Sequence, residues 1–315
     1  MPVVIGFHYP CTDGIYSALS AHVHFKNAGV TPKWAPLTVY GAEKLRLDLA
    51  ATLGPEDDLY LLDFSGGVPF LLAACARAKR VILLDHHKTA DDDITGLAGS
   101  RPLNLDTTFV DMNRSGATLA RDYFQPTLST DVNAAILLVE DNDLWRHSLP
   151  DSKAFAAGFS NLKLEMDPSK NPEIWSQLLA LDPTSVITTG HAKMAEEAAI
   201  IAAEAKTAFI LTVDSISPPL KCLAIVSAYP DLRSTAGNLL AEASRDRGLD
   251  PVGVIAYTEP GAGVGVIKVS ARSVNNFDTT IFSKAFGGGG HKGASSCIVD
   301  EAIFASWKET TSVFV

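Results

Sequence analysis

The first third of the chain alternates short, wholly apolar segments with longer amphipathic ones. Apolar segments without an alternating polar face are typical of strands that are buried on both sides, as in a parallel sheet with helices on each face. We therefore predict an α/β fold. The expected strands are VVIGF (3–7), PLTVY (36–40), DLYLLDF (58–64) and RVILLDH (80–86), and the expected helices are 14–27, 42–53 and 68–78.

The remainder of the chain divides into a helical part and a second mixed part. Helical patterns dominate from Ser115 to Leu181, and an Ala-rich stretch after Gly190 has the helix propensity of a connecting helix. Strand character returns at FILTV (209–213), KCLAIV (221–226), VGVIAY (252–257), GVGVIKVS (263–270) and SSCIV (295–299), with helices expected at 234–247 and 279–286. We predict a parallel-sheet N-terminal domain at 1–187 with helices on both faces, a connecting helix at 188–207 and a smaller mixed-sheet α/β domain at 208–315.

Composition limits the partners of such a protein. Of 315 residues, 47% are hydrophobic and 20% charged, which is usual for a globular protein with large cores. The formal net charge of −10 argues against long nucleic acid, because such binding needs many Lys and Arg side chains, but a short anionic nucleotide remains open. With no basic segment ahead of Val3 and no long apolar run, we expect a cytoplasmic protein without a membrane partner. The sequence leaves open whether it forms a homodimer.

Polar side chains follow several of the apolar segments, and Asp13 lies in the turn after the first one. Because ligands of open parallel sheets bind beyond the carboxyl ends of the strands, we expect these side chains to converge. Each of them alone is more often a turn cap, but imidazoles together with carboxylates suit Mn²⁺ or a similar divalent ion. Two ions that share a carboxylate activate water and brace a phosphoryl group. The candidate ligands are His8, Asp13, Asp63, His86 and Asp141.

Asp85 and the acidic run that follows it are not among the expected metal ligands. Asp85 is expected to orient His86 through a hydrogen bond instead of touching a metal ion, because ligating imidazoles usually donate their other nitrogen to such a partner. The run Asp91-Asp92-Asp93 is expected to be a solvated loop.

A second candidate site surrounds four consecutive glycines, 287–290, between an expected helix and an expected strand. Such a run costs backbone entropy, so it indicates positive φ angles or the close approach of a ligand, and a nest of its amides would hold an anion. The alternative is that the glycine run is a flexible linker without a ligand. Arg272 would add a bidentate guanidinium, and Arg114 begins a helix that could either meet a phosphate or simply be capped. The candidate substrate contacts are Arg114, Arg272, Ser273, Gly288, Gly289, Gly290 and His291.

Together these motifs resemble the DHH phosphoesterase superfamily, in the nanoRNase-like and bisphosphate-phosphatase-like branch whose C-terminal DHH-associated domain carries a GGGGH motif. The resemblance spans nearly the whole chain. The motifs, in family order, are HYPCTDG (8–14), LLDFS (61–65), LLDHHKTA (83–90), VEDNDLWRHS (139–148), SARS (270–273) and AFGGGGHKGAS (285–295). The resemblance implies a two-Mn²⁺ hydrolase, with Mg²⁺ or another divalent ion as an alternative, and with substrate in an interdomain cleft. The implied substrates are nanoRNA, a nucleoside 3′,5′-bisphosphate, or a linear or cyclic dinucleotide.

The resemblance also implies residue roles. The five candidate ligands named above correspond to the metal ligands of the family, with Asp63 as the bridge. His87 resembles the histidine that contacts the phosphate, so that His87 and Asp85 are the expected catalytic pair. Asp141 is preferred to Asp143 because its spacing to the following Trp-Arg-His-Ser segment matches the family pattern.

Cys11 departs from the family pattern, which has an aspartate at this position in most relatives. A thiolate ligand would favour a softer ion, or the first metal site would be weak. The alternative function is therefore a nucleotide-binding or sensing protein with a weakened metal centre.

Overall fold

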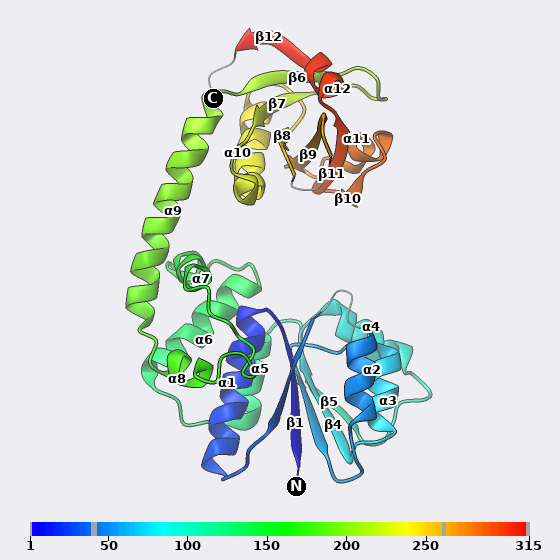
Figure 1. The fold of residues 1–315 in the computed structure, drawn as a ribbon, viewed down its shortest axis with the longest axis vertical. Coiled ribbons are helices and arrows are strands. Elements are labelled where there is room, and N and C mark those ends of the chain that lie inside the picture. Colours follow the sequence, from blue (N-terminus) through cyan, green and yellow to red (C-terminus); the bar gives the residue numbers. More distant parts are fainter. Residues whose placement is uncertain (1, 39–42, 260–262, 313–315) are drawn as a thin grey trace. The chain divides into compact units, whose positions relative to one another are not determined.

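The structure is a computed structural model that describes residues 2–38, 43–259 and 263–312. It divides into two compact units, Met1–Met194 (unit 1) and Ala195–Val315 (unit 2). The division lies within the long helix α9 (Pro183–Ala205), which includes most of the predicted connecting segment 188–207 (Figure 1).

The described part of unit 1 contains a five-stranded sheet in the order β2-β1-β3-β4-β5. Its strands are β1 (Val3–His8), β2 (Lys33–Leu37), β3 (Asp58–Leu62), β4 (Arg80–Asp85) and β5 (Leu105–Val110). Every pairing in it is parallel. The carboxyl ends of all these strands therefore lie at one edge of the sheet.

Helices cover both faces of this sheet, as Figure 1 shows. Within β3, Tyr60 and Leu62 belong to one apolar core, whereas Leu59 and Leu61 belong to the other. Successive side chains thus alternate between two buried faces, which explains why the strands are apolar without interruption. The first core includes residues of α1 (Thr12–Asn27), α5 (Gly116–Phe124), α6 (Thr130–Asp143), α7 (Ser152–Asn161) and α8 (Ile174–Leu179). The second includes residues of α2 (Glu43–Ala51), α3 (Val68–Cys75) and α4 (Lys88–Gly96).

Unit 2 contains, in its described residues, a seven-stranded sheet in the order β10-β11-β9-β8-β7-β6-β12. Only β7 and β8 pair in parallel, so the sheet is mixed. The strands are β6 (Phe209–Val213), β7 (Leu220–Val226), β8 (Val252–Tyr257), β9 (Val266–Ser273), β10 (Gly289–His291), β11 (Ala294–Asp300) and β12 (Lys308–Ser312). The helices are η1 (Pro230–Leu232), α10 (Arg233–Asp246), α11 (Thr280–Ala285) and α12 (Glu301–Ser306). Helix α10 and strand β8 lie so close together that a Cβ atom on Gly253 would overlap the carbonyl oxygen of Gly237.

The predicted α/β class is confirmed, with a parallel sheet followed by a mixed one. Some elements were missed. Strand β5 is an edge strand whose side chains are mostly exposed or half-buried, so it lacks the apolar pattern of β3 and β4. The Asp91-Asp92-Asp93 run belongs to α4 and not to a loop. Strand β2 begins three residues before the predicted PLTVY segment, and residues 39–42, which include the end of that segment and the start of the next predicted helix, lie outside the described residues.

In the part of the chain that the structure describes, no helix has both the length and the apolar character needed to span a membrane.

Candidate metal centre at the carboxyl edge of the parallel sheet

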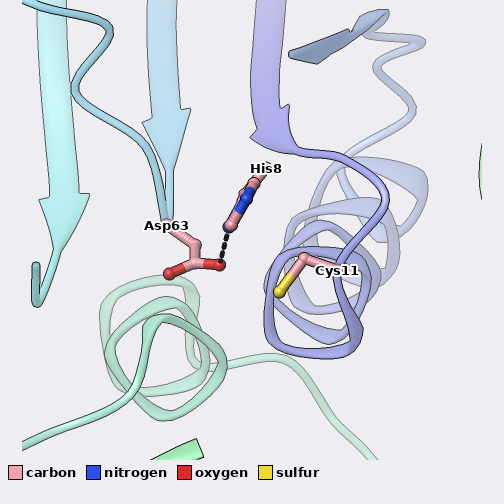
Figure 2. A group of neighbouring side chains, drawn as sticks. All are labelled: His8, Cys11 and Asp63. Carbon is pink, nitrogen blue, oxygen red and sulfur yellow. Dashed lines mark hydrogen bonds and ion pairs between the residues drawn. The ribbon is translucent and has the colours of Figure 1, made fainter. Parts of the chain in front are cut away.

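Asp63 is the central residue of a cluster at the carboxyl edge of the unit 1 sheet. It directly follows β3 in the left-handed region, with φ of 58°, a conformation that aspartate tolerates better than most residues. Its side chain is only 1% exposed. Oδ2 lies 3.1 Å from Nδ1 of His8 at the end of β1, as Figure 2 shows. Oδ1 lies 3.1 Å from Nε2 of His86, so the two oxygens of one buried carboxylate face different imidazoles.

Asp13 is placed beside Asp63 by the N-terminus of α5. Its carboxylate accepts hydrogen bonds from the backbone N–H groups of Gly116 (2.6 Å) and Ala117 (2.9 Å). These are amides at a helix start that have no partner within the helix, and the positive end of the helix dipole favours a carboxylate there. Residue 116 must be glycine, since a Cβ atom would lie 2.6 Å from Cβ of Asp63. The close approach of α5 therefore holds the two carboxylates together.

His86 and Asp143 complete the cluster. Nε2 of His86 lies 3.4 Å from Oδ2 of Asp143, the last residue of α6, and 3.6 Å from Oδ2 of Asp13. Three groups have donor atoms within 4.8 Å of one another: His8, Cys11 and Asp63; Asp63, His86 and His87; and Asp13, His86 and Asp143. Asp63 and His86 are each shared by two groups, so the cluster is continuous.

Burial and mutual proximity shift the pKa values of the side chains in this cluster. Burial, followed by the neighbouring Asp63 and Asp143, raises the pKa of Asp13 well above its usual value. Burial also raises the pKa of Asp143. Although burial opposes it, the hydrogen bond with His8 and the nearby ring of His86 lower the pKa of Asp63. Burial likewise opposes the charged form of His86, but Asp63 raises its pKa to about 9. Among the described residues, no Lys or Arg side chain pairs with Asp13, Asp63 or Asp143.

Two buried atoms in the cluster lack a hydrogen bond. Oδ1 of Asp63 and Nε2 of His86 are fully buried, and neither makes a hydrogen bond to any described residue, although they lie 3.1 Å apart. Unsatisfied buried polar atoms are costly, so a pair of them that face each other indicates a missing partner. Carboxylate oxygens with imidazole nitrogens form a donor set that suits Mn²⁺ and similar divalent ions. The residues present therefore fit a metal centre.

Asp141, which the spacing favoured as a ligand, is not part of this cluster. Its carboxylate accepts hydrogen bonds from the backbone N–H groups of Ser148 (2.9 Å) and Leu149 (3.1 Å) and from the Ser148 hydroxyl. It thus stabilises the turn after α6. Residues two apart on a helix face different directions, so Asp143 points at His86 and Asp141 does not. The structure places Asp143 where Asp141 was expected.

Asp85 orients a different histidine from the one predicted. One of its oxygens, Oδ1, accepts hydrogen bonds from the backbone N–H groups of His86 (2.7 Å) and His87 (3.0 Å) and from Nδ1 of His87 (2.8 Å). It therefore fixes the His87 ring and not the His86 ring, and this hydrogen bond raises the pKa of His87. The side chain of His87 is partly exposed and lines a cavity of about 580 Å³, together with His8, Asp63, Phe64, Ser65, Gly66, Gly67, Asp85, Thr89, Asp93 and Arg46.

Arg114 is engaged in local ion pairs instead of facing the cluster. Its guanidinium lies 2.6 Å from Asp122 and 3.3 Å from Glu140. The adjacent Ser115 caps α5. The structure therefore agrees with the capping role of this segment. The N-terminus of α5, which was the candidate phosphate site, contacts the Asp13 carboxylate instead.

Unit 2 has its own polar cavity, of about 370 Å³. The alternation of β9 places Lys268, Ser270 and Arg272 on one face, and all three line this cavity with Gly289 and Gly290. Arg272 donates hydrogen bonds to the Ala271 carbonyl and the Ser234 hydroxyl, and no described carboxylate pairs with it. Burial, followed by the neighbouring Arg233, lowers its pKa. Lys268, in contrast, pairs with Glu259 at 2.6 Å.

Three other predicted substrate contacts of unit 2, Ser273, Gly288 and His291, do not line this cavity. The Ser273 hydroxyl donates to the Phe277 carbonyl, and His291 is an exposed residue of β10 that does not line the cavity. The amides of Gly287 and Gly288 donate to the carbonyls of Lys284 and Ser283, so they close the end of α11 and do not form an anion nest. A Cβ atom on Gly288 would overlap the Ser296 carbonyl, and Gly289 and Gly290 begin the hairpin of β10 and β11.

Sequence reasoning passed over several residues that line these sites. The sequence pattern favours Asp141 over Asp143, and it does not indicate Lys268 or Arg233, which line the cavity of unit 2. The alternation of Lys268, Ser270 and Arg272 along β9 was a usable signal, because every second residue of a strand shares a face. Nothing local in the sequence separates Asp141 from Asp143.

Comparisons with known proteins support the fold. No protein-family model matches the chain. The uncharacterized protein R106 of Acanthamoeba polyphaga mimivirus is 22% identical over 298 residues, which are 93% of this chain but only 66% of that protein. The pGpG-specific phosphodiesterase PggH of Vibrio cholerae superposes with a TM-score of 0.50 at 10% identity, covering 96% of this chain and 94% of that one. The exonuclease RecJ bound to manganese gives a TM-score of 0.46 at 15% identity, covering 97% and 88%. The similarity to PggH shows a shared two-part α/β fold.

Proposed function

We propose that this protein is a divalent-metal-dependent phosphoesterase, with Mn²⁺ as the expected ion, that hydrolyses short oligonucleotides or small nucleotides. The observation that carries the proposal is the buried Asp63 carboxylate, whose two oxygens face two separate groups of donor atoms. A pair of divalent ions bound by such groups supplies water activation and stabilises the charge of a phosphoryl group.

Five side chains would hold these ions. His8 and Asp63 belong to one group, and Asp13, His86 and Asp143 to another; because Asp63 also lies 3.1 Å from His86 of that second group, Asp63 is the expected bridge. The ions would also neutralise the carboxylates that the chain leaves without a Lys or Arg partner in its described part. This is the physical reason for three acidic side chains to persist so close together.

His87 is the side chain best suited to contact the substrate. Because Asp85 accepts a hydrogen bond from its Nδ1, the nitrogen that remains for a ligand is Nε2. The ring is partly exposed at the 580 Å³ cavity that also contains Asp63. From there it would donate a hydrogen bond to a phosphoryl oxygen or to the leaving group.

The volumes of the two cavities and the negative net charge of the chain favour small substrates. Arg272 lines the 370 Å³ cavity of unit 2 without a described carboxylate partner, so it is suited to bind a terminal phosphate. The net charge of −10 opposes long polyanions. PggH is a pGpG-specific phosphodiesterase, which makes a linear dinucleotide the first substrate to test.

The test is hydrolysis by the purified full chain, stripped of metal and supplied with Mn²⁺. The panel contains pGpG, a short RNA, a nucleoside 3′,5′-bisphosphate and a cyclic dinucleotide, with product release followed by chromatography. We expect turnover of at least one of them, which is lost with chelator and in Asp63→Asn. Tight nucleotide binding without any turnover would contradict the proposal and favour the nucleotide-sensing alternative that Cys11 suggests.

A further inference from the structure

Cys11 differs from the other cysteines in its surroundings. Cys75, Cys222 and Cys297 are buried members of apolar cores, whereas Cys11 is partly exposed and belongs to none of these cores. It is the N-cap residue of α1, but its side chain makes no capping hydrogen bond. Membership of an apolar core therefore does not account for this thiol.

The thiol faces the metal centre. Figure 2 shows Cys11 at the start of α1, near His8 and Asp63, with its sulfur on the side of the Asp63 carboxylate. The sulfur, a ring nitrogen of His8 and a carboxylate oxygen of Asp63 lie within 4.8 Å of one another. Donor atoms of one tetrahedral zinc ion lie about 3.3 to 3.8 Å apart, so side-chain movements of up to about 1 Å would let these three bind one ion.

The second group of donors has a different chemistry. Asp13, His86 and Asp143 offer one nitrogen and two carboxylate oxygens, and no sulfur. Thiolate selects softer ions such as Zn²⁺, Co²⁺ and Fe²⁺, whereas carboxylates suit Mn²⁺ and Mg²⁺. Two adjacent positions with unlike donors prefer unlike ions.

We infer that the centre binds two different metals: a thiophilic divalent ion at His8, Cys11 and Asp63, and a harder ion such as Mn²⁺ at Asp13, His86 and Asp143. The inference deepens the proposed function and rests on its two-ion centre. Binding at the first position converts the Cys11 thiol to a metal-bound thiolate and releases its proton to solvent. Three protein ligands at that position leave room for a further ligand, as in other catalytic sites.

The direct test is Co²⁺ titration of the metal-free full chain, followed by ultraviolet absorption. A sulfur ligand produces a thiolate-to-cobalt charge-transfer band, which oxygen and nitrogen ligands do not. We expect one equivalent of this band in the natural protein and in the control Cys75→Ser, and its loss in Cys11→Ser. Circular dichroism verifies that each variant is folded. No band in the natural protein, or an unchanged band in Cys11→Ser, overturns the inference.

The second test measures selectivity. The chain is dialysed against equal concentrations of Zn²⁺ and Mn²⁺, and bound metal is counted by mass spectrometry. We expect the ratio of bound Zn²⁺ to bound Mn²⁺ to be lower in Cys11→Asp than in the natural protein by about tenfold or more, because the variant replaces a sulfur donor by an oxygen donor. Equal selectivity of the natural protein and Cys11→Asp contradicts the inference.

These results separate the inference from the proposed function. A Cys11-dependent cobalt band without hydrolysis of any substrate in the panel supports the mixed centre and refutes the phosphoesterase. Mn²⁺-dependent hydrolysis with no cobalt band supports the phosphoesterase and refutes the mixed centre.

Discussion

Strand β3 begins with one buried aspartate and is followed by another, and the two are treated differently by the fold. Asp58 is 2% exposed and Asp63 is 1% exposed. The guanidinium of Arg80 at the start of β4 donates to both oxygens of Asp58, from Nε at 3.0 Å and from the terminal nitrogen at 2.6 Å. Asp63 lies against the imidazoles of His8 and His86, and one of its oxygens lacks a hydrogen bond in the described residues. At the amino edge of the sheet the carboxylate is paired with a guanidinium, whereas at the carboxyl edge one carboxylate oxygen has no hydrogen bond in the described residues.

The difference separates stability from function within one strand. A paired and hydrogen-bonded carboxylate stabilises the folded state, whereas an unsatisfied buried one costs free energy until a ligand binds. Ligands of parallel sheets bind at the carboxyl edge, so the unsatisfied carboxylate lies where a ligand can reach it. The predictions below test how far each aspartate serves stability and function.

The largest expected effect is the loss of activity in Asp63→Asn. Removing the bridging charge should lower hydrolysis by about a thousandfold or more, equivalent to roughly 4 kcal/mol. The metal-free variant should also be less stable than the natural protein, because the nearby His8 and His86 hold the pKa of Asp63 low and its ionised form therefore stabilises the fold. Hydrolysis assays and thermal unfolding measure the two quantities. Full activity would show that Asp63 resembles Asp58 after all.

The next effect distinguishes Asp143 from Asp141 at the end of α6. Asp143→Asn should weaken metal binding by at least about tenfold, because it removes a ligand near His86. The matched variant Asp141→Asn should leave metal affinity unchanged but lower the free energy of unfolding by about 1 to 2 kcal/mol, because it weakens the turn bonds to Ser148 and Leu149. Metal titration and urea denaturation of both variants check this. If Asp141→Asn weakened metal binding and Asp143→Asn did not, Asp141 would be the ligand instead of Asp143.

At the amino edge, Asp58→Asn should lower the free energy of unfolding by about 1 to 2 kcal/mol, a value reduced because Arg80 is half exposed to solvent. Metal affinity should stay the same. Urea denaturation and metal titration give both numbers. A Mn²⁺ affinity that changes with Asp58 would mean that the two edges are coupled.

The smallest effect is a pH dependence of the amino edge. Hydrogen bonding to Arg80 lowers the pKa of Asp58. A carboxyl group with a lowered folded pKa contributes stability that is complete above the unfolded value, about 4, and is lost as the pH falls through the folded value. The stability difference between the natural protein and Asp58→Asn should therefore be constant from pH 5 to 8, as a rough window, and shrink at lower pH. Paired urea titrations at neutral and acidic pH measure it, and a difference that grows in acid would refute the pairing.

Much of the fold could be predicted from local patterns. Buried strands such as β3 and β4 are apolar throughout, because their two faces pack into separate cores. The edge strand β5 was missed because its side chains are mostly exposed or half-buried. The glycine run looked like an anion nest, but its first two amides are used by α11. These two hydrogen bonds depend on where α11 ends, and the number of glycines in the sequence does not predict the end of that helix.

The candidate site was predictable only in part. His8, Asp13, Asp63 and His86 come together as their positions after strands and in turns indicated. The choice of Asp143 depends on the rotation of α6 about its axis, which a difference of two residues reverses. From the sequence, the Asp85 carboxylate could accept a hydrogen bond from the ring of His86 or from that of His87. In the folded chain it accepts one from Nδ1 of His87.

By itself, the sequence determined the α/β class and the edge of the sheet where polar side chains gather, because apolar strand length and the position of polar residues after each strand are local properties. Only the tertiary structure decided which carboxylates face one another and which are already satisfied. Those outcomes depend on partners far away in the chain, such as the α5 amides that hold Asp13 and the Arg80 that holds Asp58. A carboxylate's role is set by the groups that fold against it.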